Sequence, residues 1–359
     1  MSILFVLEHY YPYIGGAEKL FRQVAEALAY EGYEVNVLTT QYEKNLAKRE
    51  KINGVQVHRV KCINRYFFTF FSIPKAWSLA RNADFIHTTT YNAAFPAWFV
   101  GKLRRKKTVL TFHEYWGALW FDLPYLSILH RWLFYSYEKL ISILPFDQYI
   151  AVSEATKNDL ISCGIQSEKI TRIYNGIQYD KFSKYKSKQS KYFTLIYYGR
   201  LGVSKGLDLI IPAWAQFVEK HPSSKLELII PTKPSSLYDT ILKSIKSFKL
   251  ENSIALFHEL EEDVLFQKVS DAHAVLIPSY KEGFCFVAAE AVALKRPIIS
   301  STKGALKEVV SGRFIEMEEH NIPTLANAME KAFQNKWSIS PIRRFTLFDA
   351  VKAYTRFYK

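Results

Sequence analysis

The chain has 359 residues, which is enough for two domains of ordinary size. Its content of 49% hydrophobic and 23% charged residues is typical of a globular protein and excludes a disordered one. A net charge of +14 favours anionic partners, namely nucleic acid, acidic lipid or a phosphorylated small molecule. Because Cys62, Cys163 and Cys285 have no paired spacing, we predict no disulfide and a reducing compartment.

The amino terminus leads directly into an apolar run at residues 3–7. This run lacks a basic flank and a cleavage site, so we interpret it as a first strand and not as a signal peptide. We find no apolar run long enough to span a bilayer. We therefore expect a cytoplasmic protein, and peripheral attachment to the cytoplasmic membrane face is a hypothesis.

Short β-rich runs alternate with amphipathic stretches, which is typical of parallel α/β layers. The strands predicted in the first half are 2–8, 34–40, 55–60, 85–90, 108–112, 148–152 and 169–174. The helices predicted there are 17–30, 92–103, 125–143 and 154–162. In the second half the predicted strands are 192–198, 225–230, 253–257, 274–277 and 297–300, and the helices are 207–219, 235–246 and 286–294.

This rhythm predicts two Rossmann-like, doubly wound α/β domains that face each other across a cleft. The first domain is predicted at 1–179 and the second at 192–341. Between them, the polar, lysine-rich segment 180–191 is predicted to be a linker. The final stretch, 342–359, alternates aromatic and basic residues at helical spacing, and we expect it to pack back on the first domain.

The most informative motif lies at residues 282–290, directly after the apolar strand 274–277. Glu282 precedes a glycine, and Glu290 follows within a run of small residues that favours a helix. A strand, a tight turn and a new helix N-terminus form a site for an anion such as a diphosphate. The two carboxylates would accept hydrogen bonds from sugar hydroxyls on either side of it, so the motif predicts a nucleotide sugar.

A second motif follows the first strand of the second half, at residues 198–206. Arg200 offers a planar fork suited to phosphate, and Lys205 offers a mobile point charge. Together they could neutralise a diphosphate and stabilise it as a leaving group. Either cation alone could equally be a solvated loop residue.

Three weaker motifs lie in the first half. Gly15 and Gly16 precede a helix and let a ligand approach the backbone, although the full dinucleotide fingerprint is absent. His113 ends a strand and could hydrogen-bond a sugar hydroxyl, with Glu114 and Asp122 as weaker candidates for contact with an acceptor. The pair 175–176, Asn-Gly, has turn chemistry and more plausibly shapes a hinge.

Metal-binding patterns are missing from the sequence: we find no Asp-x-Asp pair after a strand and no His/Cys cluster. We therefore expect no metal and no other cofactor. Charge on a diphosphate would be neutralised by Arg200, Lys205 and backbone amides.

Taken in order, these motifs resemble the retaining glycosyltransferases of the GT-B fold, specifically glycosyltransferase family 4. The matching residues are Gly15, Gly16, His113, Asn175, Gly176, Gly199, Arg200, Lys205, Gly206, Pro278, Ser279, Glu282, Glu290, Gly304 and Glu308. They span nearly the whole chain. The resemblance implies transfer of a sugar from a nucleotide-diphosphate sugar, held by the second domain, to a hydroxyl acceptor held by the first.

The resemblance also implies roles for single residues. Glu290 would bind the ribose hydroxyls, Glu282 would contact the transferred sugar, and His113 would face that sugar. The catalytic set would be His113, Glu282, Arg200 and Lys205. The donor would contact Gly15, Gly16, Arg200, Lys205, Glu282, Phe284, Cys285, Phe286, Val287 and Glu290. The favoured family mechanism is front-face attack, in which the departing phosphate takes the acceptor proton.

The sequence departs from the family pattern at two positions and in the segment after Ser311, which is short and lacks the usual glycine-rich extension. Cys285 stands where the family usually has glycine, and its side chain could crowd the sugar pocket. Ala305 replaces a common second glycine. None of these changes removes a charged anchor, so we expect activity.

The acceptor is predicted from the aromatic and basic composition of the first half. Residues 65–74 are strongly aromatic and lie between basic residues, and a second basic run spans 102–107. Trp116, Trp120, Phe121, Trp132 and Phe134 add further aromatic surface. Such composition can dock on an anionic membrane, although the same aromatics could be core. A lipid-linked or membrane-associated glycan is the predicted acceptor.

Two other functions remain open at this stage. A nucleotide-sugar epimerase of GT-B fold would share the nucleotide site, and a catalytically silent nucleotide- or carbohydrate-binding protein would share the fold. The charged residues argue against the silent protein. Nucleic-acid binding would need a basic stripe with a reading element, whereas the basic residues here are scattered over both halves.

Overall fold

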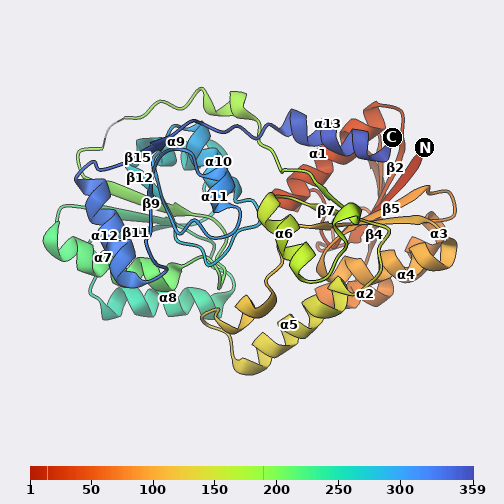
Figure 1. Cartoon of the computed structure of the whole chain (residues 1–359), viewed down its shortest axis with the longest axis horizontal. Coiled ribbons are helices and arrows are strands. Elements are labelled where there is room, and N and C mark those ends of the chain that lie inside the picture. Colours follow the sequence, from red (N-terminus) through yellow and green to blue (C-terminus); the bar gives the residue numbers. More distant parts are fainter. Residues whose placement is uncertain (14, 189) are drawn as a thin grey trace. The chain divides into compact units, whose positions relative to one another are not determined.

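The computed structural model describes residues 1–13, 15–188 and 190–359, which form two compact units (Figure 1). Unit 1 comprises Met1–Trp120, Trp132–Gly176 and Thr346–Lys359. Unit 2 comprises Phe121–Arg131 and Ile177–Phe345. None of the helices in the described residues is both long enough and apolar enough to cross a membrane.

Unit 1 is built on an eight-stranded sheet with the order β3-β4-β2-β1-β5-β6-β7-β8. Its strands are β1 (Ser2–Val6), β2 (Glu34–Thr40), β3 (Arg49–Ile52), β4 (Val55–Val60), β5 (Phe85–Thr89), β6 (Lys107–Phe112), β7 (Gln148–Ala151) and β8 (Ile170–Arg172). All neighbours are parallel except β3 and β4. Strand β1 lies inside the sheet and is wholly buried, as expected for an apolar strand covered on both faces.

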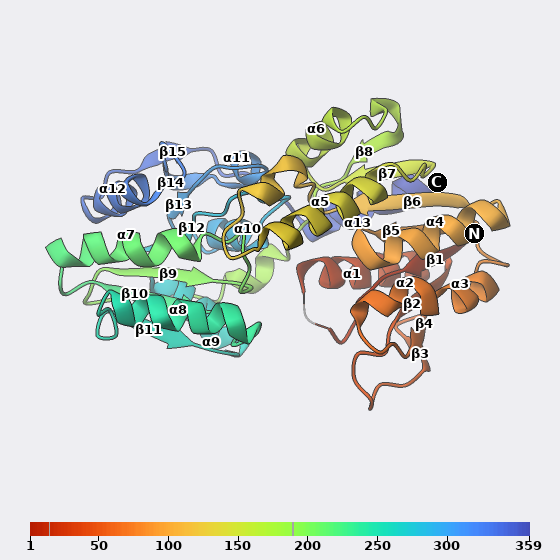
Figure 2. The ribbon, with the colours of Figure 1, turned by 90° about the horizontal axis from the view of Figure 1, so that it is seen from below.

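Helices cover both faces of this sheet (Figure 2). One face is covered by α1 (Gly16–Tyr30) and α13 (Leu347–Tyr358), whose Tyr354 and Tyr358 join the core around Phe21. The other face is covered by α2 (Phe68–Phe71), α3 (Ile73–Leu79), α4 (Ala94–Arg104), α5 (Ile128–Ser142) and α6 (Glu154–Ser162). The final helix therefore completes unit 1.

Unit 2 contains a seven-stranded sheet with the order β11-β10-β9-β12-β13-β14-β15. Its strands are β9 (Thr194–Tyr198), β10 (Lys225–Ile229), β11 (Ile254–Phe257), β12 (Ala274–Ile277), β13 (Ile298–Ser300), β14 (Gly312–Glu316) and β15 (Ser338–Ser340). Only the last pairing, between β14 and β15, is antiparallel.

Helices again cover both faces of the second sheet, so each unit is a doubly wound α/β domain (Figure 1). One face carries α7 (Leu207–Lys220), α8 (Ser235–Ser247) and α12 (Ile322–Phe333), which share a core with the strands. The other carries α9 (Glu262–Asp271), α10 (Phe286–Ala293) and α11 (Leu306–Val309).

The boundaries of the units differ from those predicted in two respects. Residues 121–131 belong to unit 2 because Asp122 and Tyr125 lie near Tyr280 of that unit. The described residues of the predicted linker, 180–188 and 190–191, also belong to unit 2, where Lys181 pairs with Glu262 of α9 at 3.0 Å. Residue 189 lies outside the described residues. The chain passes from one unit to the other after Gly176 and again after Phe345, where Ile177 N donates to Phe345 O at 2.9 Å.

Candidate functional site

The best candidate site of unit 2 lies where strand order reverses, between β9 and β12. The chain continues from β9 to β10 on one side, and from β12 to β13 on the other. Loops that leave the carboxyl ends of two such strands diverge, and doubly wound sheets bind ligands in the crevice between them. The loop after β9 carries Arg200 and Lys205, and the loop after β12 carries Ser279 and Glu282.

Lys205 and Glu282 meet directly at this point. Lys205 Nζ lies 2.8 Å from Glu282 Oε1, and Ser279 Oγ donates to the same oxygen at 2.7 Å. Glu282 is only 7% exposed. Two donors thus hold one carboxylate oxygen of a buried glutamate in a fixed orientation. The other oxygen, Oε2, has no hydrogen-bond partner among the residues that the structure describes.

Close backbone packing fixes the two loops against each other. A Cβ atom on Gly206, which has φ +74°, would lie 2.1 Å from Pro278 O. A Cβ on Gly304, with φ +61°, would lie 2.4 Å from Glu282 O. Both distances are far below van der Waals contact, so only glycine fits at either position. Gly206 therefore lets the loop after β9 approach the loop after β12, and Gly304 lets the loop after β13 approach the backbone at Glu282.

Helix α10 begins directly after this contact, at Phe286. Its first N–H groups lack intrahelical partners and carry the positive end of the helix dipole. The preceding residue, Cys285, has the left-handed conformation with φ 72°, which favours glycine. Burial and then the charge of Glu282 raise the pKa of the Cys285 thiol well above its usual range, so the thiol is neutral. Cys285 is therefore a compact apolar group beside the predicted sugar position.

Glu290 lies on α10, one turn after its first residue. Its Oε2 accepts a hydrogen bond of 3.2 Å from the hydroxyl of Tyr198, which also contacts Val287 O at 3.2 Å. Burial and then the charge of Glu290 raise the pKa of Tyr198, so this phenol stays protonated and acts as a donor. The end of β9 thus orients the carboxylate on α10.

Two further residues predicted to bind the donor, Arg200 and Phe284, also lie in unit 2. Arg200 is exposed and makes no ion pair within the described part of the chain. Phe284 is buried, and its ring packs against Phe286 and Phe345 at centroid distances of 5.3 and 5.4 Å. The ring of Phe284 therefore supports the turn before α10 by packing.

Of the residues predicted in the first half, Gly15, Gly16, His113 and Glu114 lie in unit 1, whereas Asp122 lies in unit 2. Gly15 caps α1 and Gly16 begins it. His113 follows β6, and its ring packs edge-to-face on Phe21 at 6.0 Å. Gly15, Gly16 and His113 thus belong to unit 1, and the predicted residues from Arg200 to Glu290 belong to unit 2.

A buried carboxylate holds the loop that carries His113. Glu138 of α5 accepts hydrogen bonds from Trp116 N at 3.0 Å, Gly117 N at 2.7 Å and Trp120 Nε1 at 3.1 Å. Burial raises the pKa of Glu138 to about 7, although these three donors oppose the shift. Residues 113–120 are therefore anchored to a helix through one titratable side chain.

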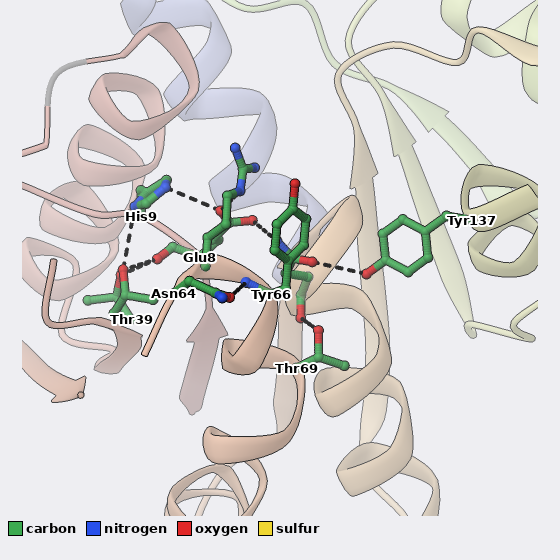
Figure 3. Close-up of polar contacts among 10 residues, drawn as sticks. Glu8, His9, Thr39, Asn64, Tyr66, Thr69 and Tyr137 are labelled. Atoms are coloured by element: carbon green, nitrogen blue, oxygen red, sulfur yellow. Dashed lines mark hydrogen bonds and ion pairs between the residues drawn. The ribbon is translucent and has the colours of Figure 1, made fainter. Parts of the chain in front are cut away.

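Unit 1 has its own reversal of strand order, between β1 and β5, and a polar cluster lies there (Figure 3). Glu8 follows β1 and is 7% exposed. Its carboxylate lies 2.8 Å from Arg65 Nε and 3.2 Å from His9 Nε2, and it accepts from Asn92 Nδ2 at 2.8 Å. Tyr137 OH donates to Asn92 Oδ1 at 3.2 Å.

This cluster holds an ionised carboxylate inside the unit. Burial opposes ionisation of Glu8, but the hydrogen bond with His9 and the charge of Arg65 outweigh it, so the pKa of Glu8 lies below its ordinary value. The side chain of Arg65 is 55% exposed and reaches the surface. The cluster can therefore present a cation and hydrogen-bonding groups to a polar ligand.

Sequence reasoning missed this cluster and the partner of Glu290. Arg65 was noted only as a flank of the aromatic segment. Glu8 ends the predicted strand 2–8, and Asn92 lies two residues after the predicted strand 85–90. Their positions at strand ends could have indicated the cluster. Nothing in the spacing of Tyr198 and Glu290 shows that they touch.

The described residues contain no group of three or more His, Cys, Asp or Glu side chains that could hold a metal ion.

Two family models match the chain almost end to end. The first, Glycosyltransferase Family 4, matches residues 14–181. The second, Glycosyl transferases group 1, matches residues 178–344. Together they cover both units.

Individual relatives agree with these matches. A human phosphatidylinositol N-acetylglucosaminyltransferase subunit is 25% identical over 353 residues, which are 95% of this chain and 70% of the human protein. An uncharacterised glycosyltransferase of Methanocaldococcus jannaschii is 26% identical, over 86% of this chain and 83% of its own length.

Solved structures of similar fold cover the whole chain. A sucrose-phosphate synthase from Thermosynechococcus elongatus has a TM-score of 0.78 at 20% identity, over 99% of this chain and 98% of its own. The Anabaena protein HepE, solved in complex with UDP-glucose, has a TM-score of 0.73 at 18% identity, over 100% and 99% of the two chains. These likenesses confirm the predicted GT-B fold.

Proposed function

The chain belongs to the glycosyltransferases of Glycosyltransferase Family 4, with the group 1 glycosyl transferase domain as its second half, and from this premise we propose its reaction in detail. It transfers a sugar from a nucleotide-diphosphate sugar, with retention of anomeric configuration, to a hydroxyl of a membrane-associated acceptor. The observation that carries the proposal is the contact between Lys205 and Glu282 at the start of α10.

The donor diphosphate lies on the first amides of α10, beside Lys205 and Arg200. Amide dipoles and two cations stabilise an anion there, and they stabilise it more as charge develops on the leaving phosphate. No metal is required for this neutralisation. The free oxygen of Glu282 then accepts a hydrogen bond from the transferred sugar, while Glu290 accepts from the ribose.

The acceptor binds to unit 1, with its polar group at the cluster of Glu8, Arg65 and Asn92. This cluster lies at the carboxyl edge of the sheet, where ligands of such sheets bind. Arg65→Gln is expected to raise the acceptor KM by roughly tenfold and to leave nucleotide affinity unchanged. Steady-state kinetics check this, and an unchanged acceptor KM would remove Arg65 from the acceptor site.

A membrane-associated acceptor is supported by relatives and by surface chemistry. The human relative is named for transfer to phosphatidylinositol. On α5, the exposed Ile128, Leu129, Trp132, Leu133 and Leu140 share one face, opposite the buried Glu138 and Ile141. Tyr66, Phe67, Phe70 and Phe71 are also exposed, in the aromatic segment before α3. Apolar side chains that face water beside basic residues suit an anionic lipid surface.

Binding of the donor is tested by calorimetry with a panel of nucleoside diphosphates and their sugars, in EDTA. We expect one nucleotide to bind to the wild-type chain without metal. The double variant Arg200→Gln/Lys205→Gln should lose at least roughly a hundredfold in turnover. Glu290→Gln should weaken nucleotide binding by about tenfold. Tyr198→Phe removes only the uncharged hydroxyl that donates to Glu290, so it should weaken nucleotide binding less.

Two results would contradict the proposal. The first is a strict need for a divalent metal. The second is conversion of the nucleotide sugar to an isomer when no acceptor is present, which would identify an epimerase. Retention itself is read from the anomeric configuration of the product by NMR.

A further inference from the structure

A hollow of about 580 Å³ lies in unit 2, at the end of the sheet opposite the candidate donor site. Phe193, His273 and Pro297 line it, and each directly precedes a strand, β9, β12 or β13. Because these strands are parallel, the residues before them gather at the amino edge of the sheet. Ser279 and Glu282 follow β12 and lie at the carboxyl edge, so the two sites are separate.

Two arginines converge on this hollow. Arg296 precedes β13, and Arg313 lies at the start of β14. Burial and then the charge of Arg313 lower the pKa of the Arg296 guanidinium, and the charge of Asp271 opposes this shift. The two guanidinium groups therefore repel each other. Within residues 1–13, 15–188 and 190–359, neither guanidinium forms an ion pair. Arg296 makes only long hydrogen bonds, to Leu294 O at 3.3 Å and Ser187 Oγ at 3.4 Å.

The other titratable groups of the hollow do not balance this charge. Asp271 is the acidic residue in its lining, and its Oδ1 already accepts from Lys188 N at 2.7 Å and Gln267 Nε2 at 2.9 Å. His273 Nδ1 accepts a hydrogen bond of 3.1 Å from Thr194 N, so its ring is held in a neutral form. Two guanidinium groups against one carboxylate leave an excess of positive charge.

An aromatic wall adjoins the arginines. Phe193, Phe333 and Trp337 line the hollow, and Phe193 packs edge-to-face on Phe333 at 5.2 Å. Phe333 is 43% exposed. Aromatic side chains that remain accessible beside paired guanidinium groups form a surface on which a ring can stack while an anion is bound.

We propose that this hollow is a second ligand site, which binds a small phosphate monoester that carries a ring. The phosphate lies between Arg296 and Arg313, where it relieves the repulsion of two like charges. The ring lies on Phe333 and Trp337. Because the site faces away from the donor loops, its ligand does not compete with the nucleotide sugar.

Phenyl phosphate is the probe, and calorimetry on the full chain is the measurement. We expect it to bind the wild type more tightly than inorganic phosphate does, and we expect phenol not to bind. The double variant Arg296→Gln/Arg313→Gln should bind phenyl phosphate roughly tenfold more weakly, or weaker still. Trp337→Leu should reduce its affinity to that of inorganic phosphate.

The matched control is Arg200→Gln/Lys205→Gln, which removes two cations from the donor site and should leave phenyl phosphate binding unchanged. Loss of binding in this control, unchanged binding in Arg296→Gln/Arg313→Gln, or no binding to the wild type would each overturn the proposal. Arg313 is exposed, so the single variant Arg313→Gln should fold normally and should weaken binding. The test therefore does not depend on substituting the half-buried Arg296. All of these measurements are of binding and none is of enzyme turnover, so their outcome does not depend on the proposed transfer reaction.

Discussion

At the scale of single residues, the two carboxylate oxygens of Glu282 differ in their contacts. One oxygen accepts from Lys205 and Ser279, which leaves the other for a ligand. A lysine that pairs with a carboxylate before the donor arrives must share its charge with the incoming diphosphate. Glu282 therefore restrains Lys205, in addition to the proposed contact with the sugar.

Glu282→Gln separates these two effects. Glutamine keeps the volume and can still accept from Ser279, but it no longer holds Lys205 by charge. We expect the affinity for the nucleoside diphosphate to stay equal or to rise, and turnover to fall by roughly a hundredfold. Calorimetry and product formation measure the two quantities. Weaker nucleotide binding with intact turnover would show that Glu282 serves the diphosphate instead.

The charged residues of the candidate site in unit 2 were all named from the sequence, but the contacts between them were not. Arg200, Lys205, Glu282 and Glu290 could be predicted because each follows a strand or lies on the helix after it. The contact between Lys205 and Glu282 joins residues 77 positions apart in the chain, and it depends on how two loops pack. The spacing of residues within a motif cannot predict a contact between two residues so far apart in the chain.

At the scale of secondary-structure elements, most strands and helices could be predicted because apolar runs and amphipathic spacing coincide with them. Strand β3 was missed because its four residues, Arg-Glu-Lys-Ile, are mostly charged and lie at an edge. The turn after it, Asn53-Gly54, has φ of 45° and 88° and is typical of a tight hairpin. The Asn-Gly dipeptide could therefore have indicated the hairpin that contains β3.

The anchoring of the loop 113–120 by α5 makes stability depend on pH. The pKa of Glu138 rises from 4.5 to about 7 on folding, because burial disfavours its charged form. The native state then binds an extra proton between these values, so this group's contribution falls as pH rises from about 4.5 to 7. At about 1.4 kcal/mol per pKa unit, the change is about 3 kcal/mol.

Glu138→Gln removes this dependence. Other groups also titrate, so the informative quantity is the difference in the free energy of unfolding between the variant and the wild type. Between pH 5 and pH 8, the stability of the wild type should fall relative to that of the variant by up to about 3 kcal/mol. Urea denaturation at several pH values measures it. A constant offset at all pH values would mean that Glu138 is charged throughout.

At the scale of the whole molecule, the net charge of +14 and the exposed apolar face of α5 lead to a prediction about lipid surfaces. If the proposed function holds, charge would attract the chain to an anionic surface over about a Debye length, and apolar side chains would then enter the interface. We expect the chain to cosediment with vesicles that contain anionic lipid, and to be released by high salt.

Trp132→Ser/Leu133→Ser should weaken vesicle binding by roughly tenfold, because it removes two large apolar groups from the exposed face. Phe348→Ser is the matched control, since Phe348 is 72% exposed on α13 and should not contribute. Equal loss in both variants would indicate that exposed apolar residues bind lipid without regard to position.

The return of the chain to unit 1 at Thr346 has a practical consequence for dissecting the enzyme. Cutting after Gly176 yields an amino-terminal piece without the helix that covers Phe21, and His87 loses its bond to Tyr358. Such a piece would expose a strip of its interior and would aggregate. Neither unit is thus one continuous segment of the sequence. A stable isolated unit 1 would need residues 346–359 joined to it.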